Sequence, residues 1–370
     1  MTAASYDVVI TGGGTGGHVM PALAIADALV ARGTPRERIL YLGARRGLEA
    51  HAVPAAGYRL ELLDLDGIQR SFAPKDMWRS ARAVVAFAGA CLACAHRFRR
   101  DRPSIVVGVG GYAAAPGVLG ARLARVPTVV HEQNAVPGVV NRLAVRAGAR
   151  AAVSFPVARW PRATVTGNPV RAEVVAVTRA PTAPPLVAVV GGSQGAGRLN
   201  DTALGLYDRW RDRDDVAVRH VAGPHHVDAC ATRLAALRAP GDRLAYELVG
   251  FESDMPGLYA AASLLLCRAG ATTVAEATVV GLPAVYVPWS GSAEGQQDAN
   301  ARAVVDAGGG VVVTDQECTV DTVAPIVSEL LADVERRATM AAAARALAHP
   351  DAAARVVDLI TASRRPGPTA

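Results

Sequence analysis

Glycine-rich runs occur twice in this sequence, and each one follows an apolar run and precedes a helical stretch. The first, "GGGTGG", lies between "YDVVIT" and "HVMPALAIADALVARG", and the second, "GGSQGAG", follows "LVAVV". Along the rest of the chain, apolar runs of strand length alternate with helical stretches, and each half holds six such runs. This alternation is typical of parallel sheets flanked by helices. It predicts an α/β protein with two Rossmann-like, doubly wound units.

A cluster of prolines and small residues marks the border between the two predicted units. It lies in "TGNPVRAEVVAVTRAPTAPPL", after which a new apolar run begins. The chain of 370 residues is also long enough for two ordinary domains. We predict a first unit over 6–168 and a second over 169–348. We also expect a C-terminal helix over 349–364 that packs back toward the first unit.

Composition narrows the class of protein. Hydrophobic residues make up 51% of the chain and charged residues 19%, which suits a folded protein with sizeable cores. No apolar run reaches the roughly 18 residues of a membrane-spanning helix, and the N-terminus lacks the regions of a signal peptide. The five cysteines are few and odd in number, which argues against a disulfide framework. We therefore expect a cytoplasmic protein.

Positive charge is concentrated between residues 75 and 102. This segment holds seven basic residues against two aspartates, a net charge of +5, and it contains the chain's single lysine. The basic residues are Lys75, Arg79, Arg82, Arg97, Arg99, Arg100 and Arg102. Within the segment, "MWRSARAVVAFAGACLACA" has apolar positions at helical spacing. Such a helix suits an anionic membrane surface or, more commonly, a core-facing position with its arginines in water.

Both glycine runs suit the binding of an anion. A glycine-rich turn at a helix N-terminus lets backbone N–H groups approach a negative charge, which the helix dipole also favours. The first run has the G-x-G-x-x-G spacing at Gly12, Gly14 and Gly17, so an NAD-dependent dehydrogenase is one alternative. A P-loop ATPase is excluded because its motif needs a lysine, and Lys75 is near neither run in the sequence.

Polar residues follow predicted strands in both halves, where parallel sheets bind their ligands. In the second half, Glu276 lies on a helix after the strand that ends at Cys267, and Gln296 and Gln297 open the next helix. The carboxylate of Glu276 can accept hydrogen bonds from both hydroxyls of a ribose. An ordinary solvated acid in the first turn of a helix is an equally good interpretation. In the first half, the corresponding residues are Tyr112, His131, Glu132 and Asn134, although a His–Glu pair is often structural.

Three short patterns resemble metal or redox sites, but each is weak. They are Cys91 with Cys94, His225 and His226 with Cys230, and Asp64 with Asp66. The first has no second cysteine pair, the second suits an exposed helix start, and the third arises often by chance. We predict no metal site.

Several motifs together resemble the MurG family of bacterial N-acetylglucosamine transferases. The matching stretches are "GGGTGGHVMPALAIADAL", "GVGGYAAAPGVLGARLARVPTVVHEQNAVPGVVNRLA", "GNPVR", "GGSQGAGRLN", "CRAGATTVAEATVVGLPAVYVPW" and "QQDANA". They follow the order of the family from Thr11 to about Ala301. "HEQN" together with "GGSQGA" is specific to the family, whereas the glycine runs alone are not.

The resemblance implies the GT-B architecture, in which two Rossmann-like domains face each other across a cleft. The first domain would face the acceptor and the membrane, and the second would bind UDP-GlcNAc. The implied reaction transfers GlcNAc from UDP-GlcNAc to the C4 hydroxyl of MurNAc on undecaprenyl-linked lipid I. It inverts the anomeric centre and gives lipid II and UDP for peptidoglycan synthesis. No cofactor or divalent metal would be obligatory, no nucleic acid would bind, and other cell-wall synthesis proteins are conceivable partners.

The resemblance also implies roles for individual residues. The donor-binding positions of the family correspond here to Thr15, Gly16, Gly17, Asn134, Arg171, Ser193, Ala271, Thr272, Thr273, Val274, Ala275, Glu276, Gln296 and Gln297. Glu276 would bind the ribose and Gln296 the GlcNAc hydroxyls, while Ser193 and Arg171 would bind the phosphates. The acceptor-side positions are Gly14, Tyr112 and His131.

A general base must accept the proton of the acceptor hydroxyl. His18, at the end of the first glycine run, is the first candidate, and Glu132 supported by His131 is the second. A purely structural role for His18, capping the loop through a hydrogen bond, is the alternative. The glycine run itself would approach the diphosphate of the acceptor.

Two positions depart from the family pattern. Glu252, in "GFESDM", stands where an aliphatic residue is usual and where the backbone would meet the uracil, which puts donor affinity in question. The stretch "SGSAEG" also differs from the commoner basic forms.

A lipid acceptor would favour the membrane interpretation of residues 75–102, with Met77 and Trp78 at the interface and the enzyme peripheral on the cytoplasmic face of the plasma membrane. The remaining alternatives are another GT-B transferase, the dehydrogenase, and a non-catalytic UDP-sugar-binding module.

Overall fold

The computed structural model describes residues 6–45, 47–63, 74–157, 160 and 162–364, with side chains described for all of these except 74–82. The chain divides into two compact units. Unit 1 comprises the chain up to Gln133, Pro137–Pro169 and the chain from Asp351 onward. Unit 2 comprises Asn134–Val136 and Val170–Pro350. Each unit is built around its own parallel sheet, so the predicted fold class is confirmed.

Within the described residues of unit 1, seven parallel strands form one sheet in the order β3-β2-β1-β4-β5-β6-β7. The strands are β1 (Val8–Thr11), β2 (Ile39–Ala44), β3 (Arg59–Leu63), β4 (Ile105–Gly108), β5 (Thr128–Glu132), β6 (Arg150–Val153) and β7 (Thr164–Val165). The helices are α1 (Gly16–Ala31), η1 (Arg36–Arg38), α2 (Glu49–Ala55), α3 (Pro74–Asp101), α4 (Ala114–Leu123), α5 (Val139–Arg146) and α14 (Ala352–Thr361). Six strands coincide with predicted apolar runs, whereas β7 is short and exposed and was not predicted.

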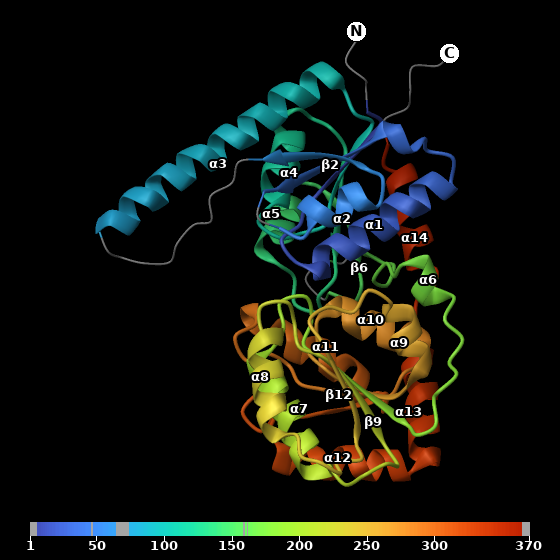
Figure 1. Cartoon of the computed structure of the whole chain (residues 1–370). Helices are drawn as coiled ribbons and strands as arrows, with labels where there is room; N and C mark the ends of the chain where they lie inside the picture. Colours follow the sequence, from blue (N-terminus) through green and yellow to red (C-terminus); the bar gives the residue numbers. More distant parts are fainter. Residues whose placement is uncertain (1–5, 46, 64–73, 158–159, 161, 365–370) are drawn as a thin grey trace. The chain divides into compact units, whose positions relative to one another are not determined.

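Alternate strand residues of unit 1 pack against helices on opposite faces of the sheet, as the strand periodicity requires. Val8 and Ile10 of β1 pack in one core with residues of α1 and α14. Val9, between them, packs on the other face with Cys94 and Phe98 of α3. The C-terminal helix α14 thus belongs to the core of unit 1 (Figure 1).

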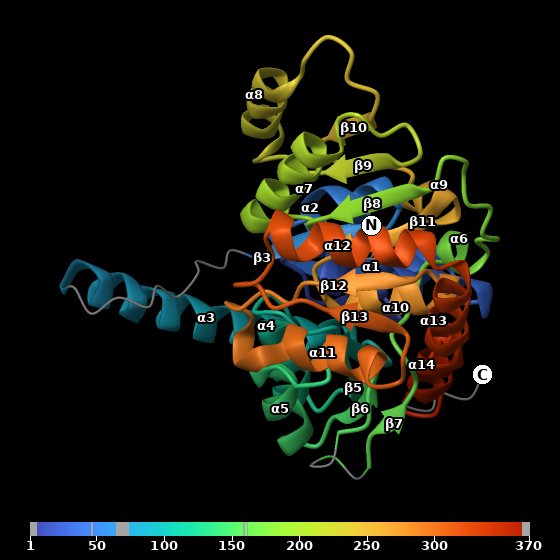
Figure 2. The same cartoon turned by 90° about the horizontal axis from the view of Figure 1, so that it is seen from below.

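Unit 2 repeats this arrangement with six parallel strands among its described residues, in the order β10-β9-β8-β11-β12-β13 (Figure 2). The strands are β8 (Leu186–Val190), β9 (Ala217–Val221), β10 (Ala245–Val249), β11 (Ala262–Cys267), β12 (Ala284–Tyr286) and β13 (Gly310–Val312). The helices are α6 (Ala172–Val175), α7 (Gly197–Trp210), α8 (Val227–Leu237), α9 (Met255–Ala261), α10 (Ala271–Val280), η2 (Ala293–Gly295), α11 (Gln296–Val305), α12 (Val320–Ala332) and α13 (Val334–Ala346).

The sheet of unit 2 is also covered on both faces. Residues of α7, α8 and α12 form one buried core with it, and residues of α9, α10 and α11 form the other. Helix α10 ends at Val280, and the next residue, Gly281, has a φ of 66°, the left-handed conformation that commonly terminates helices. The loops at the carboxyl ends of β8 and β11 lead into α7 and α10. Because these two strands are parallel neighbours, the N-termini of both helices lie at the same edge of the sheet.

Candidate active site

The first glycine run forms the loop between β1 and α1 in unit 1. Gly12, Gly13 and Gly14 have φ angles of 150°, 154° and 97°, which other residues rarely adopt. A Cβ atom at Gly12 would also lie 2.4 Å from the side chain of Val109. Close backbone packing therefore requires glycine at this loop, whether or not a ligand binds there.

A buried carboxylate that the sequence analysis did not identify lies against this loop. Glu49, the first residue of α2, is 0% exposed. Its Oε2 accepts a hydrogen bond from the Gly14 N–H at 2.7 Å, and its Oε1 accepts one from the Ala44 N–H at 2.9 Å. A Cβ at Gly13 or Gly47 would lie 2.2 or 2.0 Å from this carboxylate. Part of the glycine run thus accommodates Glu49, and the Gly14 N–H expected on the acceptor side already has an internal partner.

His18 lies in the first turn of α1, and its side chain is half-buried. Its Nδ1 is 3.4 Å from the Thr15 hydroxyl, and its ring is packed beside Gly110, where a Cβ would lie 3.2 Å from Cδ2. Burial lowers the pKa of His18 to about 4, and the negative charge of Glu49 opposes this shift. The imidazole is therefore neutral near pH 7 and able to accept a proton. The Thr15 contact is also the one expected if His18 only caps the loop.

Glu132 and His131, at the end of β5, are both buried. Glu132 Oε2 accepts hydrogen bonds from the Gly138 N–H at 2.9 Å and from Asn141 Nδ2 at 2.8 Å. His131 Nε2 lies 3.1 Å from the Gly167 carbonyl oxygen, and burial lowers the pKa of His131 to about 4. These contacts shape the turn into α5, so Glu132 is less available for proton transfer than His18.

Tyr112 follows β4 and is partly exposed. Its ring stacks on Phe87 of α3, with a centroid distance of 5.5 Å and an angle of 28° between the ring planes. The structure therefore brings an acceptor-side candidate of unit 1 into contact with the long basic helix.

In unit 2, Glu276 is the sixth residue of α10 and only 6% exposed. The interpretation of this residue as a solvated acid in the first helical turn is therefore wrong. Its Oε2 accepts a hydrogen bond from the Tyr259 hydroxyl at 2.9 Å, and its Oε1 is 3.8 Å from Arg171 Nη2. Burial raises the pKa of Glu276, and the charge of Arg171 and the Tyr259 hydrogen bond oppose that rise. Arg171 also has a buried Nε without a hydrogen-bond partner among the described residues.

Several of the predicted donor-binding residues lie at or just before helix N-termini of unit 2. Ser193 is in the β8–α7 loop, and Ala271–Ala275 form the first turn of α10. The N-cap residues of α7 and α10, Ala196 and Gly270, make no side-chain capping hydrogen bond to the first turn of their helix.

A second residue missed by the sequence analysis holds the segment Asn134–Val136 on unit 2. Asn300 of α11 is fully buried. Its Oδ1 accepts a hydrogen bond from the Ala135 N–H at 2.9 Å, and its Nδ2 donates to Asn134 Oδ1 at 3.1 Å. Asn300 thus positions Asn134, one of the residues predicted to bind the sugar-nucleotide donor. An asparagine inside a helical pattern carries no sequence signal for such a role.

The two glutamines that open α11 have different partners. Gln296 Nε2 donates to the Val136 carbonyl oxygen at 2.9 Å, so this side chain is bound to the segment Asn134–Val136. Gln297 Oε1 accepts a hydrogen bond from the Trp289 N–H at 2.9 Å and so supports the preceding loop.

Glu252, the departure from the family pattern, pairs with an arginine inside unit 2. Its Oε2 accepts hydrogen bonds from Arg219 Nε and Nη2 at 3.0 and 2.7 Å, and its Oε1 accepts one from the Asp254 N–H at 2.9 Å. The negative charge of Glu252 is therefore compensated by Arg219.

Among the residues that the structure describes, no group of three or more His, Cys, Asp or Glu side chains could hold a metal ion. Cys91 and Cys94 are buried in α3, and His225 is exposed just before α8. Asp64 and Asp66 lie outside the described residues.

Comparisons with known proteins agree with this architecture. Residues 8–153 match the glycosyltransferase family 28 N-terminal domain, and residues 186–356 match the C-terminal domain of that family. The fold and the two matched domains define a two-domain glycosyltransferase.

Individual relatives narrow this class. A protein of Halorhodospira halophila is 40% identical over 95% of this chain and 97% of its own, and one of a Nocardioides species is 41% identical over 95% and 97%. Both are named UDP-N-acetylglucosamine–N-acetylmuramyl-(pentapeptide) pyrophosphoryl-undecaprenol N-acetylglucosamine transferase. The crystal structure of Acinetobacter baumannii MurG is 28% identical, with a TM-score of 0.75 over 96% of this chain and 99% of that one. The chain belongs to the MurG family of glycosyltransferases.

Proposed function

We propose that this protein transfers GlcNAc from UDP-GlcNAc to the MurNAc C4 hydroxyl of undecaprenyl-linked lipid I, which yields lipid II and UDP. The match over nearly the whole chain to relatives that carry this transferase name supports the proposal. The buried carboxylate of Glu276, beside the uncapped N-terminus of α10, supports the binding of a nucleoside diphosphate by unit 2.

In the proposed reaction, the acceptor hydroxyl attacks C1 of GlcNAc. Its proton passes to Nε2 or Nδ1 of His18 as the new C–O bond forms on the face opposite UDP. The bond between C1 and the phosphate oxygen breaks, and its electron pair leaves with UDP, which inverts the anomeric centre. General-base assistance of this kind contributes roughly 10²–10⁴-fold in rate.

The other predicted residues take binding roles in this proposal. Glu276 accepts hydrogen bonds from the ribose hydroxyls, and Gln296 Oε1 accepts one from a GlcNAc hydroxyl. Arg171 and Ser193, with the N–H groups of the α7 and α10 first turns, stabilise the charge on the phosphates. In unit 1, the N–H groups of Thr15, Gly16 and Gly17 are proposed to face phosphate oxygens, and Gly14, Tyr112 and His131 to lie on the acceptor side.

The decisive assay measures transfer from radiolabelled UDP-GlcNAc to a lipid I analogue. We expect His18→Ala to lose most turnover while its affinity for UDP-GlcNAc stays near that of the unchanged protein. His51→Ala, which changes an exposed histidine of α2, is the matched control and should retain turnover. Donor binding without transfer by the unchanged protein would instead favour a UDP-sugar-binding module. Tight binding in a fluorescence titration with NADH would favour a dehydrogenase.

Donor selection tests the second unit. We expect Glu276→Ala to weaken UDP and UDP-GlcNAc binding together, and Gln296→Ala to weaken only UDP-GlcNAc. Gln316→Ala, an exposed glutamine of the same unit, should change neither. UDP-GalNAc, which differs in orientation at C4, should be a poor donor because buried polar groups lose their partners. Equal weakening of UDP and UDP-GlcNAc by Gln296→Ala would remove Gln296 as the sugar reader.

We also propose that no divalent metal is obligatory, because helix N-termini and side chains are proposed to stabilise the leaving phosphate. Turnover should then survive EDTA. Loss of turnover in EDTA and its recovery with Mg²⁺ would return attention to Asp64 and Asp66.

We propose that the protein binds its lipid acceptor at the cytoplasmic face of the membrane. Helix α3 is the proposed membrane contact. No helix among the described residues is long and apolar enough to span a bilayer. In Figure 1 the N-terminal part of α3 extends away from the unit 1 sheet. Within α3, Val85 is 72% and Leu92 63% exposed, which suits insertion of apolar side chains at an interface.

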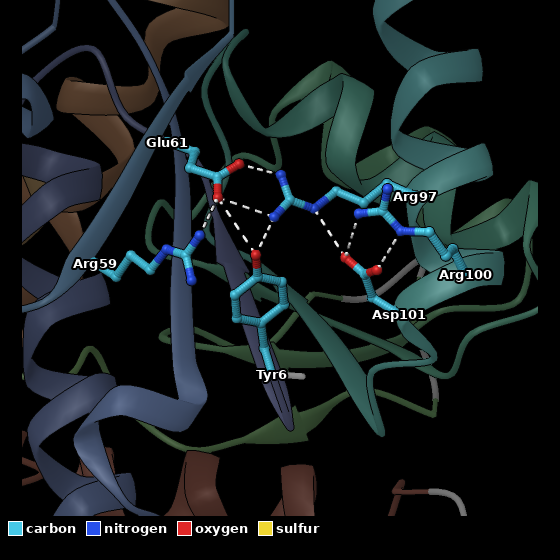
Figure 3. Close-up of polar contacts among 6 residues, drawn as sticks. All are labelled: Tyr6, Arg59, Glu61, Arg97, Arg100 and Asp101. Atoms are coloured by element: carbon cyan, nitrogen blue, oxygen red, sulfur yellow. Dashed lines mark hydrogen bonds and ion pairs between the residues drawn. The ribbon is translucent and has the colours of Figure 1, made fainter. Parts of the chain in front are cut away.

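The C-terminal end of α3 contributes less free charge than the sequence count indicates. Arg97 forms an ion pair with Glu61 and contacts Tyr6 (Figure 3). Arg100 pairs with Asp101 at 2.7 Å, and Arg99 donates to the Leu123 carbonyl oxygen at 2.8 Å. Arg97 thus attaches α3 to the edge strand β3 and Arg99 attaches it to α4, whereas Arg100 pairs within α3 itself. The proposed membrane contact therefore rests on residues before Arg97. The side chains of 74–82, Lys75, Met77, Trp78, Arg79 and Arg82 among them, lie outside the described residues.

Vesicle binding tests this contact. Val85→Asp should weaken binding to anionic phospholipid vesicles and leave turnover with a soluble acceptor analogue unchanged. Val334→Asp is the matched control, because Val334 is 65% exposed in α13 of unit 2. Equal vesicle binding by the two variants would contradict the assignment to α3.

A further inference from the structure

Tyr259 connects the apolar core of unit 2 to the proposed donor site. It lies in α9, is 1% exposed, and packs in the core formed by α9, α10 and the sheet. Its hydroxyl donates to Glu276 Oε2 at 2.9 Å. A tyrosine hydroxyl in such surroundings needs a partner, and the partner here is the carboxylate proposed to bind ribose.

The hydrogen bond leaves most of the acceptor capacity of Glu276 unused. A carboxylate has about four lone-pair sites, and Tyr259 fills one of them. The other oxygen, Oε1, is 3.8 Å from Arg171 Nη2, beyond hydrogen-bond distance. Two ribose hydroxyls would therefore donate to Oε1 and to the remaining lone pair of Oε2.

We propose that Tyr259 is a positioning residue for nucleotide binding, whose hydroxyl fixes the orientation of the Glu276 carboxylate toward the two ribose hydroxyls. This inference rests on the proposed role of Glu276. Without the tyrosine hydroxyl, the carboxylate would lose a fixed donor and could rotate toward Arg171. The ribose would then have to order the carboxylate at the moment of binding, which reduces affinity.

The same hydrogen bond affects the protonation of Glu276. Burial raises its pKa, as does the charge of Glu173, while Arg171 and the Tyr259 hydrogen bond lower it. Removal of the hydroxyl should therefore raise the pKa further. Ribose binding needs the ionised form of Glu276. As the pH is lowered, the UDP affinity of a variant without the Tyr259 hydroxyl should therefore begin to fall at a higher pH than that of the unchanged protein.

Unit 2 offers a matched control for the loss of a buried hydroxyl. Tyr286 of β12 is fully buried in the same core as Tyr259. Its hydroxyl has no hydrogen-bond partner among the described residues. Tyr286→Phe and Tyr259→Phe therefore remove the same atom from the same core, and only the second change removes a bond to Glu276.

The test measures UDP affinity of the full chain by calorimetry. We expect Tyr259→Phe to weaken UDP binding about tenfold, the scale of one hydrogen bond to a charged group, and Tyr286→Phe to weaken it less than about twofold. Binding of 2′,3′-dideoxy-UDP, which lacks both ribose hydroxyls, should be the same in Tyr259→Phe and the unchanged protein. A general loss of core packing would weaken both ligands, so equal losses for UDP and the dideoxy analogue would overturn the inference.

A double variant separates this inference from the proposed function. In the Glu276→Ala background, Tyr259→Phe should have no further effect on UDP affinity, because the group that it positions is gone. If Glu276→Ala itself leaves UDP affinity unchanged, the proposed ribose site is wrong. If Glu276→Ala weakens UDP but Tyr259→Phe behaves like Tyr286→Phe, only the positioning role is overturned.

Discussion

Replacement of Glu49 with glutamine tests whether a buried carboxylate shapes the first glycine run. Glutamine has nearly the same size and shape, but one of the two acceptor oxygens becomes an NH₂ group. That group would face either the Gly14 N–H or the Ala44 N–H, both of which now donate to Glu49. The substitution therefore removes one hydrogen bond and places the new NH₂ group against a backbone N–H, so that two donors face each other. It does not create a cavity.

The size of the effect follows from these two bonds. A hydrogen bond to a charged group contributes about 1.5–3 kcal/mol, and a buried donor left without an acceptor costs about 1–3 kcal/mol. These contributions overlap, so we expect Glu49→Gln to lower the free energy of unfolding of unit 1 by about 3 kcal/mol. The loop between β1 and α1 leads directly to His18 in the first turn of α1, so turnover should fall as well. UDP affinity should stay unchanged because unit 2 is intact.

Chemical unfolding and transfer assays measure the two effects on the same preparations. Glu61→Gln is the control, since Glu61 also accepts hydrogen bonds in unit 1 but at the edge strand β3, where Arg97 is its partner (Figure 3). The control should retain turnover. A Glu49→Gln protein with unchanged stability and turnover would refute the view that the glycine run is built around this carboxylate.

Two further predictions concern buried polar groups. Burial lowers the pKa of His131 and of His220 from 6.5 to about 4, so below pH 6.5 the unfolded chain binds more protons than the folded one. The free energy of unfolding should therefore fall as the pH falls from 6.5 toward 4, by about 2 kcal/mol per histidine between pH 7 and pH 5; equal stability at these two pH values would contradict it. Asn300→Ala should speed amide hydrogen exchange at Ala135, whose N–H donates to Asn300, and unchanged exchange there would show that Asn300 does not hold this segment.

The sheets were predictable because their signal is local. Each predicted strand is a short apolar run bounded by turn residues, and burial on both faces of a parallel sheet makes such runs nearly continuous. Strand β7 fails this rule: Thr164 and Val165 are exposed at the sheet edge, so no apolar run marks them.

The supporting residues of the candidate site were not predictable because their roles depend on distant segments. Glu49 resembles any acid at a helix start, and only the approach of Gly13, Gly43 and Gly47 shows that it is enclosed. The role of Asn300 could not be predicted for the same reason, because its hydrogen-bond partners precede it by about 165 residues. Charge counts fail for a related reason: they record Arg97 as a surface cation, whereas it is paired with Glu61.

The two buried carboxylates, one in each unit, show how a binding group is distinguished from a structural one. Both Glu49 and Glu276 lie next to a strand–helix loop, and both are removed from water. Glu49 accepts two backbone N–H groups, one on each oxygen, and glycines enclose it so closely that no ligand has room. Glu276 has one hydrogen bond, an arginine beyond bonding distance, and a raised pKa. A buried carboxylate with unused acceptor sites costs stability until a donor arrives, so Glu276 is the one suited to bind hydroxyl groups.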